Sequence, residues 1–161
     1  MERQAEGVDL FLCETMSLVR ETRAATIAAV ESQLPVWVDF TVDDSNGTCL
    51  RSGESLADAA QEVVALGAER IMVNCSVTTA MAELARLKEP FGGYANGFIS
   101  VAPLQPGGTV DKLASRVDLD PAAYAEHAIQ WVEQGATAVG GCCEVESAHI
   151  ATLVKRLNEK G

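Results

Sequence analysis

Short apolar runs alternate along the chain with stretches whose apolar residues recur at helical spacing. A short apolar run is typical of a buried strand, and a repeat every three or four residues is typical of an amphipathic helix. The predicted strands cover residues 8–13, 36–41, 71–75, 94–101 and 136–139. The predicted helices follow them at 18–32, 56–67, 78–87, 120–134 and 150–157.

This order predicts an α/β fold with a parallel sheet and right-handed crossover connections. The runs are apolar at nearly every position, as in strands that are covered on both faces. No glycine-rich phosphate fingerprint follows the first run, so the pattern does not support a dinucleotide-binding fold.

Polar or reactive side chains gather where the predicted strands end. They are Cys13-Glu14-Thr15, Thr41 with Asp43 and Asp44, Asn74-Cys75-Ser76, Asn96, and Cys142-Cys143. In a (β/α)8 barrel this rim carries the chemistry, but such a barrel has eight strands and about 250 residues. The chain has 161 residues and five predicted strands. We therefore predict a partial (β/α)8 TIM barrel of five parallel strands alternating with helices, with residues 1–161 as the C-terminal portion of a barrel domain.

Composition narrows the classes of partner and the compartment. The formal net charge of −11 argues against nucleic acid or an anionic membrane, because both select clustered Lys and Arg. No apolar run approaches the roughly 20 residues that cross a bilayer, and the polar residues 1–7 do not resemble a signal peptide. We therefore expect a cytoplasmic protein, in which unpaired cysteines indicate burial, metal binding or catalysis rather than disulfides.

Three cysteines on the predicted rim are candidates for one metal site. Cys75 ends one apolar run, and Cys142-Cys143 follow another after Gly140-Gly141, whose backbone freedom allows two adjacent ligands. Catalytic zinc sites combine three protein ligands with one open position. Because Zn²⁺ lowers the pKa of a bound thiol, a substrate thiol in that position would be a thiolate nucleophile. Such a site suits alkyl transfer to sulfur.

The same residues also allow simpler interpretations. A lone cysteine is often a small buried hydrophobe, which is the interpretation we prefer for Cys13 and Cys49. The Cys142-Cys143 pair could form a structural turn or a redox pair, although vicinal disulfides are strained. His127 and His149 lie within predicted helices, away from strand ends, and we do not expect either to bind the metal.

Two polar residues on the rim are candidates for substrate binding. The carboxylate of Glu14 could hold the amino group of an amino-acid substrate, or it could be a solvated loop charge. Asn74 could orient Cys75 or the substrate, or it could cap the next helix. The polar loop 43–54 could cover a ligand, or it could be an ordinary surface loop.

The cysteine segments resemble the zinc-binding pattern of the homocysteine S-methyltransferase family. They are Val73-Asn74-Cys75 and Val139-Gly140-Gly141-Cys142-Cys143. Four further segments are similar to the family: residues 9–15, residues 36–41, Leu50-Arg51-Ser52-Gly53-Glu54, and Tyr94-Ala95-Asn96.

The resemblance implies that Cys75, Cys142 and Cys143 bind zinc, and that homocysteine binds to the zinc through its sulfur and is methylated to methionine. It implies that Glu14 helps to bind the homocysteine amino group and that Asn74 stands beside the first ligand. The family's first three strands have no counterpart in the chain, and Glu144 stands where a glycine usually follows the cysteine pair.

Two functions stay open on the sequence. The first is an enzyme that moves a methyl group to homocysteine from a small donor, which could be S-methylmethionine, S-adenosylmethionine, betaine or a methylfolate. The second is a non-catalytic zinc- or thiol-binding module that needs another chain, or an N-terminal half, to complete the barrel. Because five strands leave two open sheet edges, we expect a homo-oligomer or a complex with a barrel-completing chain.

Overall fold

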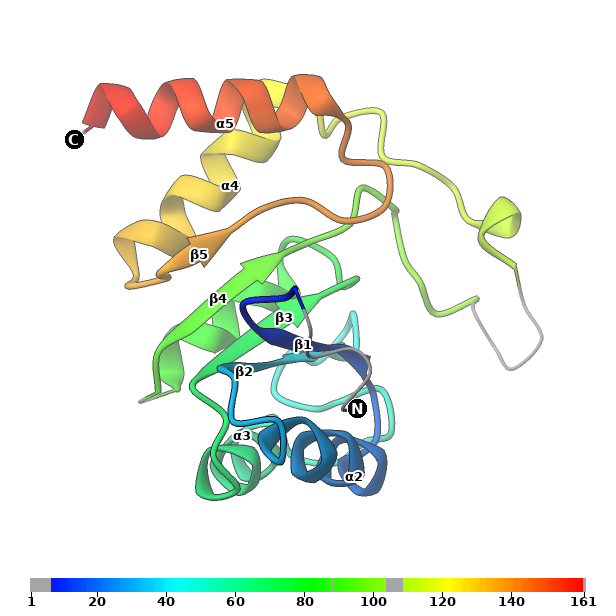
Figure 1. The fold of residues 1–161 in the computed structure, drawn as a ribbon. Helices are drawn as coiled ribbons and strands as arrows, with labels where there is room; N and C mark the ends of the chain where they lie inside the picture. Colours follow the sequence, from blue (N-terminus) through cyan, green and yellow to red (C-terminus); the bar gives the residue numbers. More distant parts are fainter. Residues whose placement is uncertain (1–6, 88, 104–108, 161) are drawn as a thin grey trace.

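Five parallel strands form one sheet in the computed structural model, which describes residues 7–87, 89–103 and 109–160 (Figure 1). The sheet order β1-β2-β3-β4-β5 follows the chain order, so each strand pairs in parallel with the next. The elements are β1 (Phe11–Met16), α2 (Val19–Val30), β2 (Val36–Phe40), α3 (Leu56–Ala65), β3 (Arg70–Asn74), η1 (Ala80–Arg86), β4 (Phe91–Tyr94), η2 (Val110–Lys112), α4 (Pro121–Glu133), β5 (Ala138–Val139) and α5 (Ser147–Lys160). The predicted α/β fold with five parallel strands is confirmed.

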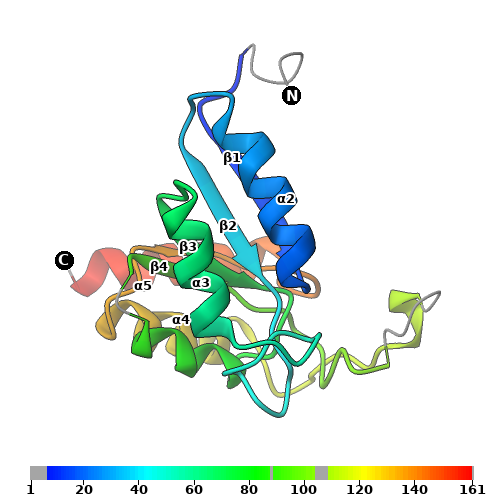
Figure 2. The same cartoon turned by 90° about the horizontal axis from the view of Figure 1, so that it is seen from below.

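The helices form two groups along the sheet. Helices α2 and α3 lie near the β1–β2 end, and α4 and α5 pack together beside β4 and β5 (Figure 1). Seen from below, α2 runs alongside β1 and β2 (Figure 2). None of the helices in the described part of the chain is long and apolar enough to cross a membrane.

The two faces of the sheet differ in burial. One face carries the apolar core, in which Val36, Val38, Phe40, Ile71 and Val73 are each at most 1% exposed. The strand register places the alternate residues on the opposite face, where Leu12 is 43% exposed. The expectation that both faces are covered therefore holds for β2 and β3, where Asp39 and Met72 on that face are at most 4% exposed, but not for the edge strand β1.

The fourth strand lies at Phe91–Tyr94, not at residues 94–101. Glycine is unfavourable in strands, so the sequence at Gly92-Gly93 does not by itself favour a strand. In the structure, a Cβ on Gly92 would lie 2.4 Å from the carbonyl oxygen of Ala138 and 2.6 Å from the sulfur of Met72. Glycine is present here because the β5 backbone and the Met72 side chain leave no room for a side chain.

Of two predicted helices, one begins at the expected residues and the other is of a different helix type. Helix α4 begins as predicted, with Oδ1 of Asp120 accepting hydrogen bonds from the backbone amides of Ala122 and Ala123, and Pro121 at its first position. Gly135, at φ 108°, follows its end. In contrast, the helix predicted at 78–87 is a seven-residue 3-10 helix, η1. Apolar spacing does not distinguish these two helix types over so few residues.

Candidate metal centre and substrate rim

Cys75 directly follows β3 and has an unusual backbone conformation. Its φ of 49° is in the left-handed region, which costs a residue with a Cβ about 1 kcal/mol. Arg51, from the loop between β2 and α3, donates a hydrogen bond of 2.6 Å from Nη2 to the carbonyl oxygen of Cys75. This charged contact holds the turn that aims the Cys75 side chain across the rim.

The cysteine pair is held by the loop after β4. The amide of Cys142 donates to the carbonyl of Ala95 at 3.0 Å, and the carbonyl of Cys143 accepts from the amide of Gly97 at 2.8 Å. Neither glycine before the pair has a positive φ. Instead, a Cβ on Gly141 would lie 2.2 Å from Cγ1 of Val145. Gly141 is therefore needed for close packing and not, as expected from the sequence, for backbone freedom.

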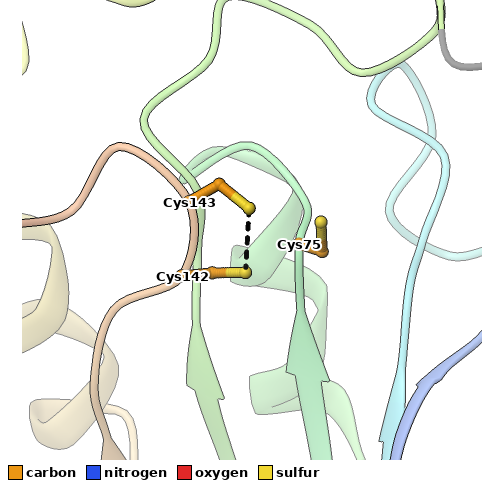
Figure 3. Close-up of side chains that lie close together, drawn as sticks. All are labelled: Cys75, Cys142 and Cys143. Atoms are coloured by element: carbon orange, nitrogen blue, oxygen red, sulfur yellow. Dashed lines mark hydrogen bonds between the residues drawn. The ribbon is translucent and has the colours of Figure 1, made fainter. Parts of the chain in front are cut away.

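The three sulfur atoms of Cys75, Cys142 and Cys143 all lie within 4.8 Å of one another (Figure 3). The Sγ atoms of Cys142 and Cys143 are 3.9 Å apart. A tetrahedral zinc ion with bonds of about 2.3 Å to sulfur has its ligands about 3.8 Å apart. The spacing and the chemistry of the three donors therefore fit a zinc ion, with one coordination position left for another group.

The thiols of this cluster share their protons unequally. The pKa of the Cys75 thiol is lowered to about 6, mainly by the hydrogen bond from Cys142. Burial acts in the opposite direction, and the positive charge of Arg51 adds to the lowering. The pKa of Cys142 is raised, first by its hydrogen bond to Cys75 and then by burial. Cys75 is thus the thiol that the surroundings favour as a thiolate.

Glu14 lies inside β1, not beyond its end, because the strand continues to Met16. The register with β2 shifts between Cys13 and Met16, and Thr15 has a φ of 61°. This bulge keeps the exposed Glu14 on the face of the sheet that carries Leu12. There its Oε1 accepts a hydrogen bond of 2.9 Å from the hydroxyl of Tyr94.

Asn74 is 1% exposed and supports the same bulge. Its Nδ2 donates a hydrogen bond of 2.8 Å to Oγ1 of Thr15, which ties the end of β3 to the strained part of β1. Its Oδ1 is buried and has no hydrogen-bond partner among the described residues. Asn74 thus lies between the first cysteine and the residue after Glu14, and its contact with a substrate stays a prediction.

Comparison with known proteins shows to which family the chain belongs. The sequence profile of the family described as Homocysteine S-methyltransferase matches residues 2–157. The chain belongs to the homocysteine S-methyltransferase family.

Three known enzymes are similar to this member of the homocysteine S-methyltransferase family over nearly the whole chain. The homocysteine S-methyltransferase of Escherichia coli (strain K12) is 31% identical over 156 residues, which are 93% of this chain and 48% of that enzyme. The selenocysteine methyltransferase of Astragalus bisulcatus is 27% identical, over 94% of this chain and 45% of that enzyme. The methionine synthase of Mycobacterium tuberculosis (strain ATCC 25618 / H37Rv) is 28% identical, over 89% of this chain and 12% of that enzyme. The chain spans about half the length of the first two relatives or less.

Solved structures agree with this family and fold. The metallated form of the homocysteine methyltransferase MmuM from Escherichia coli matches with a TM-score of 0.67 and 25% identity, over 93% of this chain and 46% of that one. YagE of E. coli K12, a member of the dihydrodipicolinic acid synthase family, matches with a TM-score of 0.56 and 16% identity, over 98% of this chain and 50% of that one. The similarity to YagE shows a shared fold only.

Sequence reasoning about this member of the homocysteine S-methyltransferase family missed three side chains of the rim: Arg51, Tyr94 and Asp39. Each lies in a segment that is similar to the homocysteine S-methyltransferase family, but the sequence predicted no individual function for any of the three. One signal was available for Asp39, because it is a charged residue inside the apolar run Val36–Phe40. For Arg51, only the path of its loop shows that it reaches Cys75.

The residues that were not expected to bind the metal lie outside the sulfur cluster. Cys13 is 7% exposed and belongs to the hydrophobic core. A ring nitrogen of His149, Nε2, lies 3.1 Å from the carbonyl oxygen of Leu119, and the ring packs edge-on against Tyr124. These contacts give His149 a structural place in the α4–α5 region of this homocysteine S-methyltransferase family member.

Proposed function

We propose that this chain contributes the metal- and thiol-binding part of an enzyme that transfers a methyl group from a small donor to the thiol of homocysteine, giving methionine. The observation that carries the proposal is the cluster of three cysteine sulfurs within 4.8 Å of one another, in a chain whose family is that of homocysteine S-methyltransferases. Cys75, Cys142 and Cys143 would hold the zinc ion.

The chain's own residues would prepare this site in distinct ways. When bound, zinc would supply a Lewis acid that keeps a thiol ionised at neutral pH. The loop after β4 holds the cysteine pair in place through the backbones of Ala95 and Gly97. Arg51 brings a positive charge next to Cys75, which offsets part of the negative charge of three clustered thiolates. A reducing cytoplasm, which we propose as the location, would keep these thiols free.

Glu14 and Asn74 are proposed to position the amino acid. The exposed carboxylate of Glu14 is on the face of the sheet that carries Leu12 and would accept hydrogen bonds from the substrate's ammonium group. Asn74 would act through Thr15, whose strained backbone conformation follows Glu14 directly. Glu14 and Asn74 are thus proposed to support binding of the amino-acid end of homocysteine, opposite its thiol.

The first test is metal content. The purified protein should hold about one zinc ion per chain by inductively coupled plasma mass spectrometry, and Cys75→Ser should lose most of it, because two remaining thiolates form an incomplete site. Cys49→Ser is the matched control, because Cys49 lies outside the sulfur cluster and its loss should leave the metal content unchanged. Unchanged zinc in Cys75→Ser contradicts the proposed ligand set.

Activity needs its own assay. Methionine formation from homocysteine is measured with S-methylmethionine, S-adenosylmethionine, betaine and a methylfolate offered in turn. We expect turnover with one of these donors. If the barrel needs another chain for its completion, that chain is added to the assay. The turnover rate should fall about a hundredfold or more in Cys75→Ser. Zinc binding without turnover for any donor would contradict the enzymatic part of the proposal.

A further inference from the structure

Three side chains from three different strands meet on the face of the sheet that carries Leu12. The hydroxyl of Tyr94 on β4 lies 2.9 Å from Oε1 of Glu14 on β1. The same hydroxyl makes a second, short hydrogen-bond contact with Oδ2 of Asp39 on β2. One phenol therefore lies between two carboxyl groups, one of which is exposed and the other of which is 0% exposed.

A phenol hydroxyl has one hydrogen to donate and can also accept. If both carboxyl groups were ionised, only one of them could receive this hydrogen, and the other would face the phenol oxygen with no hydrogen between them. The buried Oδ1 of Asp39 also has no hydrogen-bond partner among the described residues. An ionised carboxylate in that environment would be buried with too few donors, which is costly.

We propose that Asp39 carries a proton in the folded protein, donates it in a hydrogen bond to the oxygen of Tyr94, and thereby directs the Tyr94 hydroxyl hydrogen to Glu14. The chain of donors then runs in one direction, from Asp39 through Tyr94 to Glu14. Asp39 is a positioning residue in this arrangement, and Glu14 is the ionised carboxylate presented on the rim. The role of Glu14 in holding the substrate's ammonium group rests on the proposed function. The proton on Asp39 does not depend on that function.

The groups around Asp39 favour the protonated form. Burial is the main cause that raises the pKa of Asp39 to about 7, and the negative charge of Glu14 adds to it, while the hydrogen bond with Tyr94 acts in the opposite direction. Cys13 on β1 is a further titratable neighbour: burial raises the pKa of its thiol, and Asp39 adds to this rise. On β3, Arg70 places its guanidinium 4.3 Å from the centre of the Trp37 ring. The β3 residue paired with Asp39 is the uncharged Met72.

The proton on Asp39 is tested by stability as a function of pH. A carboxyl group whose pKa is raised on folding contributes stability that is complete below its unfolded pKa and is lost as pH rises through its folded pKa. The melting temperature of Asp39→Asn should therefore rise relative to that of the wild type between pH of about 4 and about 7, and the difference should then level off. Asp9→Asn, which changes an exposed aspartate, should show no such difference.

Two measurements can each overturn the proposed proton on Asp39. Parallel pH profiles for the wild type and Asp39→Asn overturn the proposal, because they mean that Asp39 has the same charge in the folded and unfolded states. Infrared difference spectra give a second measurement that needs no unfolding. A carbonyl band of a protonated carboxyl group should be present in the wild type at pH of about 6 and absent from Asp39→Asn, and its presence in both variants overturns the assignment to Asp39.

Homocysteine binding tests the positioning role separately. By calorimetry at pH of about 6, Asp39→Ala should weaken binding about tenfold, and Asp39→Asn should recover most of that loss, because an amide can also donate to the Tyr94 oxygen. Equal loss in the two variants contradicts a donor role for Asp39. If the wild type binds no homocysteine while the stability profiles differ as expected, the proposed function fails and the proton on Asp39 stands.

Discussion

Arg51 is the residue whose role depends most on tertiary contact. Its side chain crosses from the loop after β2 to the turn after β3, where it contacts a carbonyl oxygen and places its charge near the Cys75 thiol. The guanidinium therefore has two effects at one position. It holds a left-handed backbone conformation, and it counters the negative charge that three clustered thiolates would accumulate.

Replacement of Arg51 should weaken metal binding without unfolding the chain. Arg51→Met keeps much of the side-chain volume but removes the hydrogen bond and the charge, and we expect zinc affinity to fall about tenfold in competition with a chromophoric chelator. Arg23→Met is the matched control, because Arg23 is exposed and pairs with Glu62 on α3. Equal zinc affinities for the wild type and Arg51→Met would contradict this role.

Glu144, directly after the cysteine pair, has a backbone conformation that residues with a side chain rarely adopt. Its φ of 64° explains why a glycine suits this position after the cysteine pair. The side chain compensates in part, because its Oε2 accepts a hydrogen bond of 2.7 Å from the hydroxyl of Ser115. The carboxylate is thus directed toward the segment after η2 and takes part in a specific contact there.

At the scale of the elements, β4 is the strand whose sequence is least typical of a strand. Its four residues, Phe-Gly-Gly-Tyr, include two glycines, and the strand lies between β3 and β5 in the sheet. The close approach of β5 and of Met72 excludes a side chain at Gly92. A glycine that weakens a strand in isolation is therefore required by the packing of its neighbours.

Gly92→Ala should be strongly destabilising for this reason. The new Cβ would lie 2.4 Å from a backbone oxygen, so β4 and β5 must separate, and we expect the free energy of unfolding in urea to fall by about 2 kcal/mol or more. Gly140→Ala is the control, because its Cβ would meet Cβ of Tyr94 at an ordinary 3.5 Å and should cost less than about 1 kcal/mol. Similar losses in the two variants would mean that lost glycine flexibility, not steric exclusion, sets the cost.

At the scale of the whole molecule, the described sheet has two edge strands that each pair on one side only. Strand β1 pairs only with β2, and β5 pairs only with β4. Leu12 on β1 is 43% exposed. Open strand edges and exposed apolar side chains favour pairing with further strands. We therefore propose that this sheet is completed by a second copy of the chain or by another chain that supplies barrel strands.

This proposal predicts the mass of the protein in solution. Light scattering at micromolar concentration should give a mass above the 17.0 kDa of one chain. Leu12→Lys on the edge strand should shift the population toward the single chain, because it places a charge at the proposed contact. Val154→Lys, on the 51% exposed side chain of α5, should not. A wild-type protein of uniform 17.0 kDa mass would contradict the assembly.

The sequence by itself determined the features that depend on local patterns. Apolar runs and helical spacing identified five strand–helix units, and the Asp120-Pro121 start of α4 and the Gly135 end follow from backbone chemistry within a few residues. Cys75 follows the third apolar run and Cys142-Cys143 follow the fifth, and these positions predicted that the three cysteines meet at one rim. Parallel strands bring such positions together whatever the details of packing.

Tertiary structure alone decided the features that depend on distances between strands. The glycines of β4, the contact of Arg51 with the Cys75 turn, and the meeting of Asp39, Tyr94 and Glu14 all join segments far apart in the chain. Local propensity carries no information about such neighbours, because the same residue is favourable or costly according to the group that it contacts and the depth at which it is buried.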